Sequence, residues 1–229
     1  MCGRFTLTQN PNGFCREWNL PQILDWKPRY NVSPGQFVQV HYFDPGSKQV
    51  THQDMFWGLP NSMHPGSEAH RHINARIETA AEKPTFRNAI RERRCIILGD
   101  GFYEWGHVSG RVKQPFHVTS GLRALFAFSG IWEWDPSPTH LERRAFAILT
   151  RDANSTLASI HPRMPVLVRP EKIEDWLDPN LRDPSQIQAM TDAFTAEEVR
   201  LIPVGTQVNN ARYDAEDCMT PQRAQKTLF

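Results

Sequence analysis

The stretch Phe37-Val-Gln-Val-His-Tyr-Phe43, followed by Asp44-Pro45-Gly46-Ser47 and then by Val50-Thr-His-Gln-Asp-Met-Phe-Trp57, decides the fold class. Alternating apolar positions, rich in β-branched and aromatic side chains, predict two strands at 37–43 and 50–57. Asp, Pro, Gly and Ser in succession are typical of a tight turn. Together these residues predict a β-hairpin.

Similar patterns predict strands along the whole chain and only a few helices. The predicted strands cover residues 95–98, 116–119, 124–132, 145–150, 165–168 and 201–204. The predicted helices cover residues 85–94, 170–177 and 184–194, and each one follows or begins with a proline. We therefore expect an α+β fold with a dominant antiparallel sheet in one compact domain.

Composition limits the classes of function. The chain has 229 residues, with 26 Lys and Arg against 25 Asp and Glu, and a net charge of +1. This balance argues against a generally basic nucleic-acid coat and against an acidic tail, so any site for a polyanion must be local. At 39% hydrophobic and 10% aromatic residues, the chain can form a packed core, which excludes wholesale disorder.

The cysteines and the N-terminus indicate the compartment. Four cysteines lie far apart without a Cys-x-x-Cys pair, which predicts neither a disulfide framework nor a zinc cluster and fits a reducing, cytosolic setting. The first twenty residues lack a signal-peptide pattern, and no apolar run is long enough to span a membrane. The polar loop with His64, His70 and His72 is more typical of a solvated turn than of a metal site, so we expect neither metal nor cofactor.

Cys2 is capable of chemistry that an internal cysteine cannot perform. If Met1 is removed, which a small second residue permits, the chain begins with an α-amine and a thiol on adjacent carbons. An α-amine has a pKa of about 7.7 to 8.0, so roughly a tenth of it is nucleophilic at pH 7. With an aldehyde the amine forms an imine, and the thiol then closes a thiazolidine ring. Position alone leaves open that Cys2 belongs to a frayed terminus or is a small core residue.

Asn74, Arg76 and Glu78 stand at alternate positions, so in an extended chain they share one face. An amide and a guanidinium side by side suit a carbonyl or phosphate oxygen. The alternative is an exposed strand face that carries an ordinary Arg-Glu pair.

Glu104 and His161 are the candidate proton-transfer residues. Glu104 stands between two aromatic residues in Gly-Phe-Tyr-Glu-Trp, residues 101–105, where partial burial suits a general acid or base. His161 lies two residues before Arg163; imidazole transfers protons near neutral pH, and the guanidinium offers a fixed positive charge. A surface carboxylate on an aromatic-rich bend and a structural histidine in a proline-rich loop are the alternatives.

Taken together, these segments resemble the SRAP family (SOS-response-associated peptidase), the abasic-site processing proteins. The matching stretches are residues 1–5, 30–36, 56–59, 74–79, 101–105 and 160–165. Their order and spacing match over about the whole chain, and the combination is highly specific. The resemblance implies a single domain over residues 1–229, with a barrel-like antiparallel sheet, peripheral helices and a short C-terminal tail from about residue 215.

The resemblance also implies an activity on single-stranded DNA that contains abasic sites. Cys2, as the mature N-terminal residue, would condense with the ring-opened aldehyde and form a thiazolidine crosslink that shields the lesion. Asn74 would position the amine and the sugar oxygens, Glu104 would act as acid and base, and His161 would exchange a proton at the deoxyribose. Strand cleavage of the AP-lyase type, reversal of the crosslink and removal of Met1 by the protein itself are further implied reactions.

The DNA contacts follow from the same resemblance. Arg4, Arg76 and Arg163 are the implied phosphate contacts, a role that suits guanidinium. The family commonly has a base-wedging tryptophan shortly after the Trp57-Gly58-Leu59 motif; this chain has none there, and Trp57 and Met63 are its candidates for base stacking. Pro162 stands where the family commonly has Asp, which bears on the orientation of the His161 ring.

Two rival functions stay open. An N-terminal-cysteine amidohydrolase or peptidase would use the same thiol on a carboxamide, because Met-Cys-Gly openings also occur in glutamine-dependent amidotransferases. A noncovalent single-stranded DNA binding module would stack bases on aromatic residues and follow the phosphates with arginines. Hydrolysis of glutamine would indicate the first, and DNA retention that does not need Cys2 would indicate the second.

The last five residues, 225–229, resemble the Gln-x-x-Leu-Phe peptide by which bacterial DNA enzymes dock on the sliding clamp. Gln225, Leu228 and Phe229 would make that contact, and a tail packed on the domain is the alternative. We expect a protein of the bacterial cytoplasm, associated with the nucleoid, or of the nucleus if the source is a eukaryote, without a membrane partner.

Overall fold

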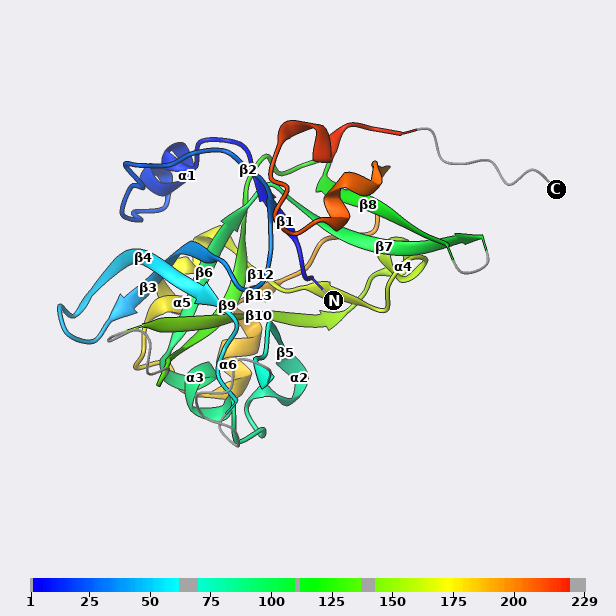
Figure 1. The fold of residues 1–229 in the computed structure, drawn as a ribbon. Helices are drawn as coiled ribbons and strands as arrows, with labels where there is room; N and C mark the ends of the chain where they lie inside the picture. The colour runs from blue at the N-terminus through cyan, green and yellow to red at the C-terminus, as the bar shows by residue number, and fades with distance from the viewer. Residues whose placement is uncertain (1, 62–69, 110–111, 137–142, 223–229) are drawn as a thin grey trace.

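The computed structural model describes residues 2–61, 70–109, 112–136 and 143–222 (Figure 1). Its strands are β1 (Phe5–Leu7), β2 (Arg29–Val32), β3 (Phe37–Asp44), β4 (Gln49–Trp57), β5 (Asn74–Arg76), β6 (Arg94–Gly99), β7 (Gly101–Ser109), β8 (Val112–Ser120), β9 (Phe126–Trp134), β10 (Arg144–Asp152), β11 (Arg163–Pro165), β12 (Leu167–Val168), β13 (Thr191–Asp192) and β14 (Val199–Pro203). Its α-helices are α1 (Asn12–Glu17), α2 (Ile77–Ala80), α3 (Arg87–Glu92), α4 (Ser155–Ala158), α5 (Ile173–Leu177) and α6 (Pro184–Ala189), and short 3-10 helices cover Pro170–Lys172, Thr206–Asn209 and Glu216–Met219.

The predicted hairpin is present and belongs to a closed barrel. β3 and β4 pair antiparallel, with Phe37 opposite Phe56, and Lys48 in the turn has a left-handed φ of 56°. β3 also pairs with β6, β6 with β9, β9 with β10, and β10 with β4. Because this order returns to its starting strand, the sheet closes on itself.

A second sheet holds the N-terminus inside the molecule. Its order is β14-β8-β7-β1-β2, so β1 is an interior strand. Phe5 pairs with Val32 of β2 on one side and with Phe102 of β7 on the other. Strand β1 accordingly lies within the molecule in Figure 1 rather than at its edge.

Strand β6 is buried on both faces, which explains its continuous apolar sequence. Ile97 points into a cluster that also contains Cys2, Phe5 and Trp57. The neighbouring Ile96 and Leu98 belong to a second cluster, which includes apolar residues of α3, α5 and α6. Helices α3, α5 and α6 therefore cover the outer face of the barrel.

The α+β class with a dominant antiparallel, barrel-like sheet is confirmed, and within it β4 and β5 pair parallel with β10. One local expectation is wrong: Glu78 does not share an extended face with Asn74 and Arg76, because the chain turns from β5 into α2 at Ile77. In the described part of the C-terminal segment, Cys218 is fully buried and Pro221 is paired with Val204.

Some predicted boundaries also change. The segment Gly101–Ser109, for which no element was predicted, is the long strand β7, and the short strands β1 and β2 were missed because three or four residues carry little periodicity. Within the described ranges, no helix has the length and apolar character that crossing a membrane requires.

Candidate active site

Cys2 lies inside the protein, at the start of the segment that becomes β1. Its side chain has 0% exposure and packs in the same cluster as Phe5 and Trp57. The backbone N–H of Tyr103 donates to the carbonyl oxygen of Arg4 over 2.9 Å, which extends the pairing of β1 and β7 toward Cys2. The terminal segment is therefore held in place, in contrast to the frayed terminus considered above.

Asn74 reaches Cys2 from strand β5, which is fixed against β10 with Asn74 opposite Ile148. Its Nδ2 donates a hydrogen bond of 3.0 Å to the carbonyl oxygen of Cys2. Its Oδ1 is buried, and no residue of the described ranges donates a hydrogen bond to it. Asn74 thus has one hydrogen-bonding group engaged by Cys2 and a second one still to be satisfied.

Glu104 comes to the same place from β7, where it is buried. Burial raises the pKa of the Cys2 thiol above its ordinary value of 9.0, and the negative charge of Glu104 raises it further. The thiol is therefore protonated at neutral pH. A neutral thiol beside a carboxylate can lose its proton as it attacks, but it is not a thiolate before the attack.

His161 completes the group from the loop between α4 and β11. Its Nδ1 lies 3.9 Å from Oε1 of Glu104, and the His161 side chain is 25% exposed against 4% for Glu104. The backbone N–H of Arg163 donates to the same Nδ1 over 3.0 Å, which orients the ring. The four residues nominated as catalytic therefore form one chain of neighbours that begins with Asn74 at Cys2, continues through Glu104 and ends at the partly exposed imidazole.

Arg163 and Arg76, both expected to contact phosphate, have different surroundings. Arg163 makes two hydrogen bonds to Glu78, of 2.9 and 2.8 Å, and a third of 2.5 Å to Asp152. Arg76 is exposed, and within the described ranges no carboxylate pairs with it. Arg76 is thus available to a phosphate as it stands, whereas Arg163 must exchange a carboxylate for one.

Arg4 hydrogen-bonds to Asn31, a buried residue to which the sequence motifs assigned no role. Its Nη1 donates to Oδ1 of Asn31 over 2.8 Å. The Nδ2 of Asn31 donates to three backbone carbonyls of the C-terminal segment, those of Val208, Asn210 and Tyr213. In the other direction, the Asp214 carboxylate of the C-terminal segment accepts hydrogen bonds from the backbone N–H groups of Tyr30 and Asn31. The available signal was Asn31 within the family-like stretch of residues 30–36, because a buried amide needs several partners.

A family model described as SOS response associated peptidase (SRAP) matches residues 1–211. The chain belongs to the SRAP family. The abasic site processing protein YoqW of Bacillus subtilis is 32% identical over 221 residues, which cover 95% of this chain and 98% of that protein. The abasic site processing protein YedK of Escherichia coli is 28% identical over 232 residues, which cover 96% of this chain and 100% of that protein.

A solved structure of a protein from Bacteroides thetaiotaomicron shares the fold. It has a TM-score of 0.77 at 22% identity, covering 97% of this chain and 100% of that one. The abasic site processing protein HMCES of Gallus gallus is 29% identical over 228 residues, covering 86% of this chain and 67% of that protein.

Trp57, within the SRAP motif, has a place that differs from the expected base-stacking role. Its side chain has 0% exposure, its ring stacks on Phe146 with centroids 6.0 Å apart, and Phe5 covers it from another side at 5.4 Å. A base cannot reach a ring that is enclosed in this way, so Trp57 is a core residue. Met63 and the expected clamp-binding residues Gln225, Leu228 and Phe229 lie outside the described residues.

Proposed function

We propose that this SRAP protein recognises abasic sites in single-stranded DNA and, after removal of Met1, crosslinks to them through Cys2 as a thiazolidine. The observation that carries the proposal is the convergence of Asn74 and Glu104 on a buried N-terminal cysteine. The relatives named abasic site processing proteins support the substrate class.

The first step joins the α-amine nitrogen of Cys2 to C1′ of the ring-opened sugar. Glu104 accepts a proton from the amine and returns it to the carbinolamine hydroxyl, which leaves as water and gives an imine. The Cys2 sulfur then adds to the imine carbon, and the thiol proton passes to the imine nitrogen. One water is lost in total, and the ring contains both the nitrogen and the sulfur of Cys2.

Asn74 positions the amine in this scheme. Its Nδ2 holds the Cys2 carbonyl, while its buried Oδ1 has no donor within the described residues. A buried acceptor without a partner costs about 1–3 kcal/mol. The amine released by removal of Met1 brings N–H donors to this position, so the mature terminus completes the hydrogen bonding of Asn74.

His161 transfers protons at the sugar. From the imine, His161 removes a proton from C2′, the bond from C3′ to the phosphate oxygen breaks, and a C2′=C3′ double bond forms, which cleaves the strand. Proton donation to the thiazolidine sulfur opens the ring to the imine, and addition of one water to the imine carbon then releases the Cys2 amine and the sugar aldehyde, which reverses the crosslink. The partly exposed imidazole beside the buried Glu104 supports both roles.

The rival hydrolytic function is less well supported. A cysteine amidohydrolase or peptidase uses the thiol as its first nucleophile, and both burial and Glu104 raise the pKa of the Cys2 thiol. Within the described ranges, no histidine hydrogen-bonds to this thiol. A neutral thiol that acts second, on an imine already formed, agrees better with the site.

The test is a crosslinking assay with C-terminally tagged protein, because an N-terminal tag would block the nucleophile. The substrate is a single-stranded oligonucleotide with one abasic site; the controls are the undamaged strand and a tetrahydrofuran analogue that has no aldehyde. We expect an adduct that survives denaturation with the abasic strand only, and its loss in Cys2→Ala. Absence of an adduct from protein whose mass shows a free Cys2 would overturn the proposal.

A further inference from the structure

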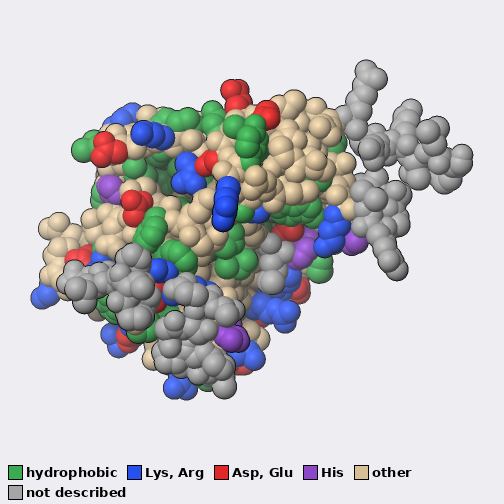
Figure 2. Space-filling model, viewed as in Figure 1, with side chains coloured by type: hydrophobic (Ala, Val, Ile, Leu, Met, Phe, Trp, Pro, Cys, Tyr) green, Lys and Arg blue, Asp and Glu red, His purple; other side chains and the backbone are tan. Residues whose placement is uncertain are grey.

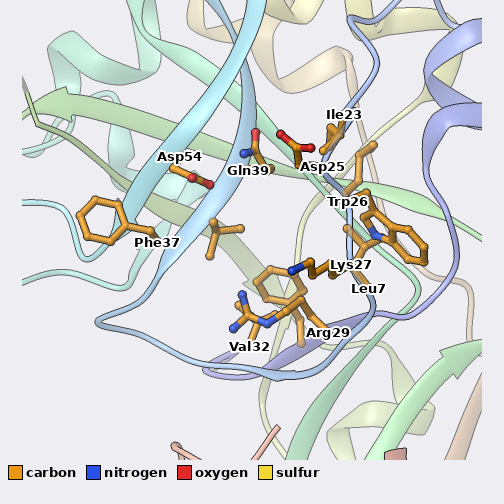
Figure 3. Close-up of a pocket in the computed structure, with 13 residues that line it drawn as sticks. Leu7, Ile23, Asp25, Trp26, Lys27, Arg29, Val32, Phe37, Gln39 and Asp54 are labelled. Atoms are coloured by element: carbon orange, nitrogen blue, oxygen red, sulfur yellow. The ribbon is translucent and has the colours of Figure 1, made fainter. Parts of the chain in front are cut away.

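A cavity of about 360 Å³ lies beside β1, and the crosslinking steps do not use it (Figure 3). Phe5 and Val32 contribute to its apolar lining and are paired across β1 and β2. Phe5 follows Cys2 by three residues, so the two are at most about 10 Å apart along an extended chain. Phe5 and Val32 also belong to the same buried cluster as Cys2. The cavity is therefore a close neighbour of the reacting site.

Charged and amide groups gather on one side of this cavity. Gln39 and Asp54 are paired across β3 and β4, and Figure 3 shows the Gln39 side chain next to that of Asp25, with Asp54 beyond Gln39. Lys27, two residues after Asp25, lies below Asp25 in the same view. Within the described ranges, Asp25, Lys27 and Asp54 form neither an ion pair nor a side-chain hydrogen bond. His52 Nδ1 lies 2.7 Å from Oε1 of Gln39 and fixes its amide.

These groups do not suit a phosphate. The nearby Arg29 is already engaged by Asp214 over 2.5 Å, so the charges left to a ligand are the two carboxylates and one ammonium. Carboxylates accept N–H donors, and Lys27 donates to a carbonyl oxygen. Figure 2 shows hydrophobic side chains in a hollow beside α1, with side chains of both charges along its border. The lining therefore selects a flat, uncharged group that carries N–H donors next to a carbonyl.

A guanine base has this pattern, with N–H groups at N1 and N2 beside the carbonyl oxygen O6. Cytosine has an amino group beside a ring nitrogen and a carbonyl, whereas thymine has no amino group. Cavities of about 300–1,000 Å³ with apolar walls and a few polar groups are typical of small-ligand sites. Proteins read an extruded base through polar groups on its edge and through apolar or aromatic contact with its face, and Trp26 supplies an aromatic wall here.

We propose that this cavity, the base pocket, receives a guanine of the strand that carries the abasic site. Asp25 and Asp54 accept from the N1 and N2 groups, and Lys27 donates to O6. With stacked nucleotides about 3.4 Å apart, the distance from Cys2 to Phe5 corresponds to a guanine within about three nucleotides of the lesion. This inference rests on the proposed function, because it assumes that the abasic site binds at Cys2.

The experiment measures how the second-order rate of crosslinking depends on the neighbouring bases. An abasic strand that otherwise contains only thymine is compared with strands that have a single guanine at each of three positions on either side. We expect guanine at one position to raise the rate by about fivefold or more, the low end for a specific base contact. At saturating protein, the crosslinking rates of the strands with and without guanine are expected to agree within about twofold, because the chemical step is the same.

Variants of the two carboxylates separate base reading from simple charge effects. Removal of a negative charge raises the affinity for every strand, so the readout is the ratio of the guanine rate to the thymine rate. Asp25→Asn and Asp54→Asn are expected to bring this ratio to about one, whereas Glu171→Gln, which neutralises an exposed carboxylate of the Pro170–Lys172 helix, keeps it. Saturating free guanosine is expected to abolish the preference by competing for the pocket.

Equal rates at all positions, or a preference that survives Asp25→Asn and Asp54→Asn, would overturn the base pocket. Binding of free guanosine without any effect of a guanine in the strand would also overturn it and would indicate a free nucleoside as the ligand. If no DNA is crosslinked, the proposed function fails by itself. The affinities for tetrahydrofuran strands with guanine or thymine then still test the pocket.

Discussion

Replacement of Asn74 with alanine removes both hydrogen-bonding groups that this side chain offers to Cys2. The bond of 3.0 Å from Nδ2 to the Cys2 carbonyl contributes about 1 kcal/mol. A hydrogen bond to Oδ1 from the amine nitrogen, which gains positive charge as it attacks the aldehyde, adds about 2 kcal/mol in the transition state. The loss of about 3 kcal/mol corresponds to a roughly hundredfold slower crosslinking reaction.

The assay is single-turnover crosslinking to an abasic strand, with protein whose intact mass shows that Met1 is absent. Binding to a tetrahydrofuran strand is measured in parallel and is expected to change by less than about threefold, since Asn74 acts on the nucleophile. Asn88→Ala, an exposed position of α3, is the matched control and should react at the native rate. A fully processed Asn74→Ala protein that crosslinks within about threefold of the native rate would refute the positioning role.

Four further predictions concern the same chain. Cys2→Ala should give no heat-stable adduct, yet borohydride should trap its imine with the abasic strand; an unchanged heat-stable adduct would contradict the role of the sulfur. Because the Cys2 thiol has a raised pKa, the rate of its alkylation by iodoacetamide should still be rising at pH 9 without a plateau. Glu104→Gln should increase this rate at every pH, because the charge of Glu104 contributes to the raised pKa. A plateau near pH 8 would contradict the raised pKa. Trp57→Ala should lower the free energy of unfolding in urea by about 3–5 kcal/mol, as expected for a buried ring, and a stable variant that only loses DNA affinity would restore the base-stacking role. Burial lowers the pKa of His41 and of His117 to about 4, so below pH 6.5 the unfolded chain binds more protons than the folded chain. The free energy of unfolding should therefore fall by up to about 2.5 kcal/mol per pH unit between pH 6 and pH 5. A flat pH profile would contradict the burial of these two histidines as neutral side chains.

The hairpin and the barrel strands were predictable because their periodicity is local. In β3 and β4, apolar and polar side chains tend to alternate, so the sequence itself indicates which face each residue belongs to, and the turn between the strands has a specific composition. The parallel contact of β4 with β10 was not predictable, because it depends on the closure of the barrel and leaves no mark on either strand. The packed segment 215–222 was missed for a related reason, since only the burial of Cys218 shows that it belongs to the body.

The catalytic residues were predictable as residue types in motifs, and their mutual contacts were not. Asn74 and Glu104 lie far from Cys2 in sequence, and only the strand pairings bring them to it. The partners of Arg163 could not be foreseen either, because Glu78 reaches it only after the chain turns into α2. Trp57 has an aromatic side chain that suits either a core or a base, and burial alone decides between them.

The measurement that tests the central claim most directly is the mass of the covalent adduct, followed by mapping of the modified residue after nuclease and protease digestion. We predict a mass equal to that of the protein without Met1 plus the abasic strand minus one water, with the sugar fragment on Cys2 and no Cys2 thiol left to alkylate. An adduct on a lysine, or a sugar-bearing Cys2 whose thiol still reacts with iodoacetamide, would contradict the thiazolidine.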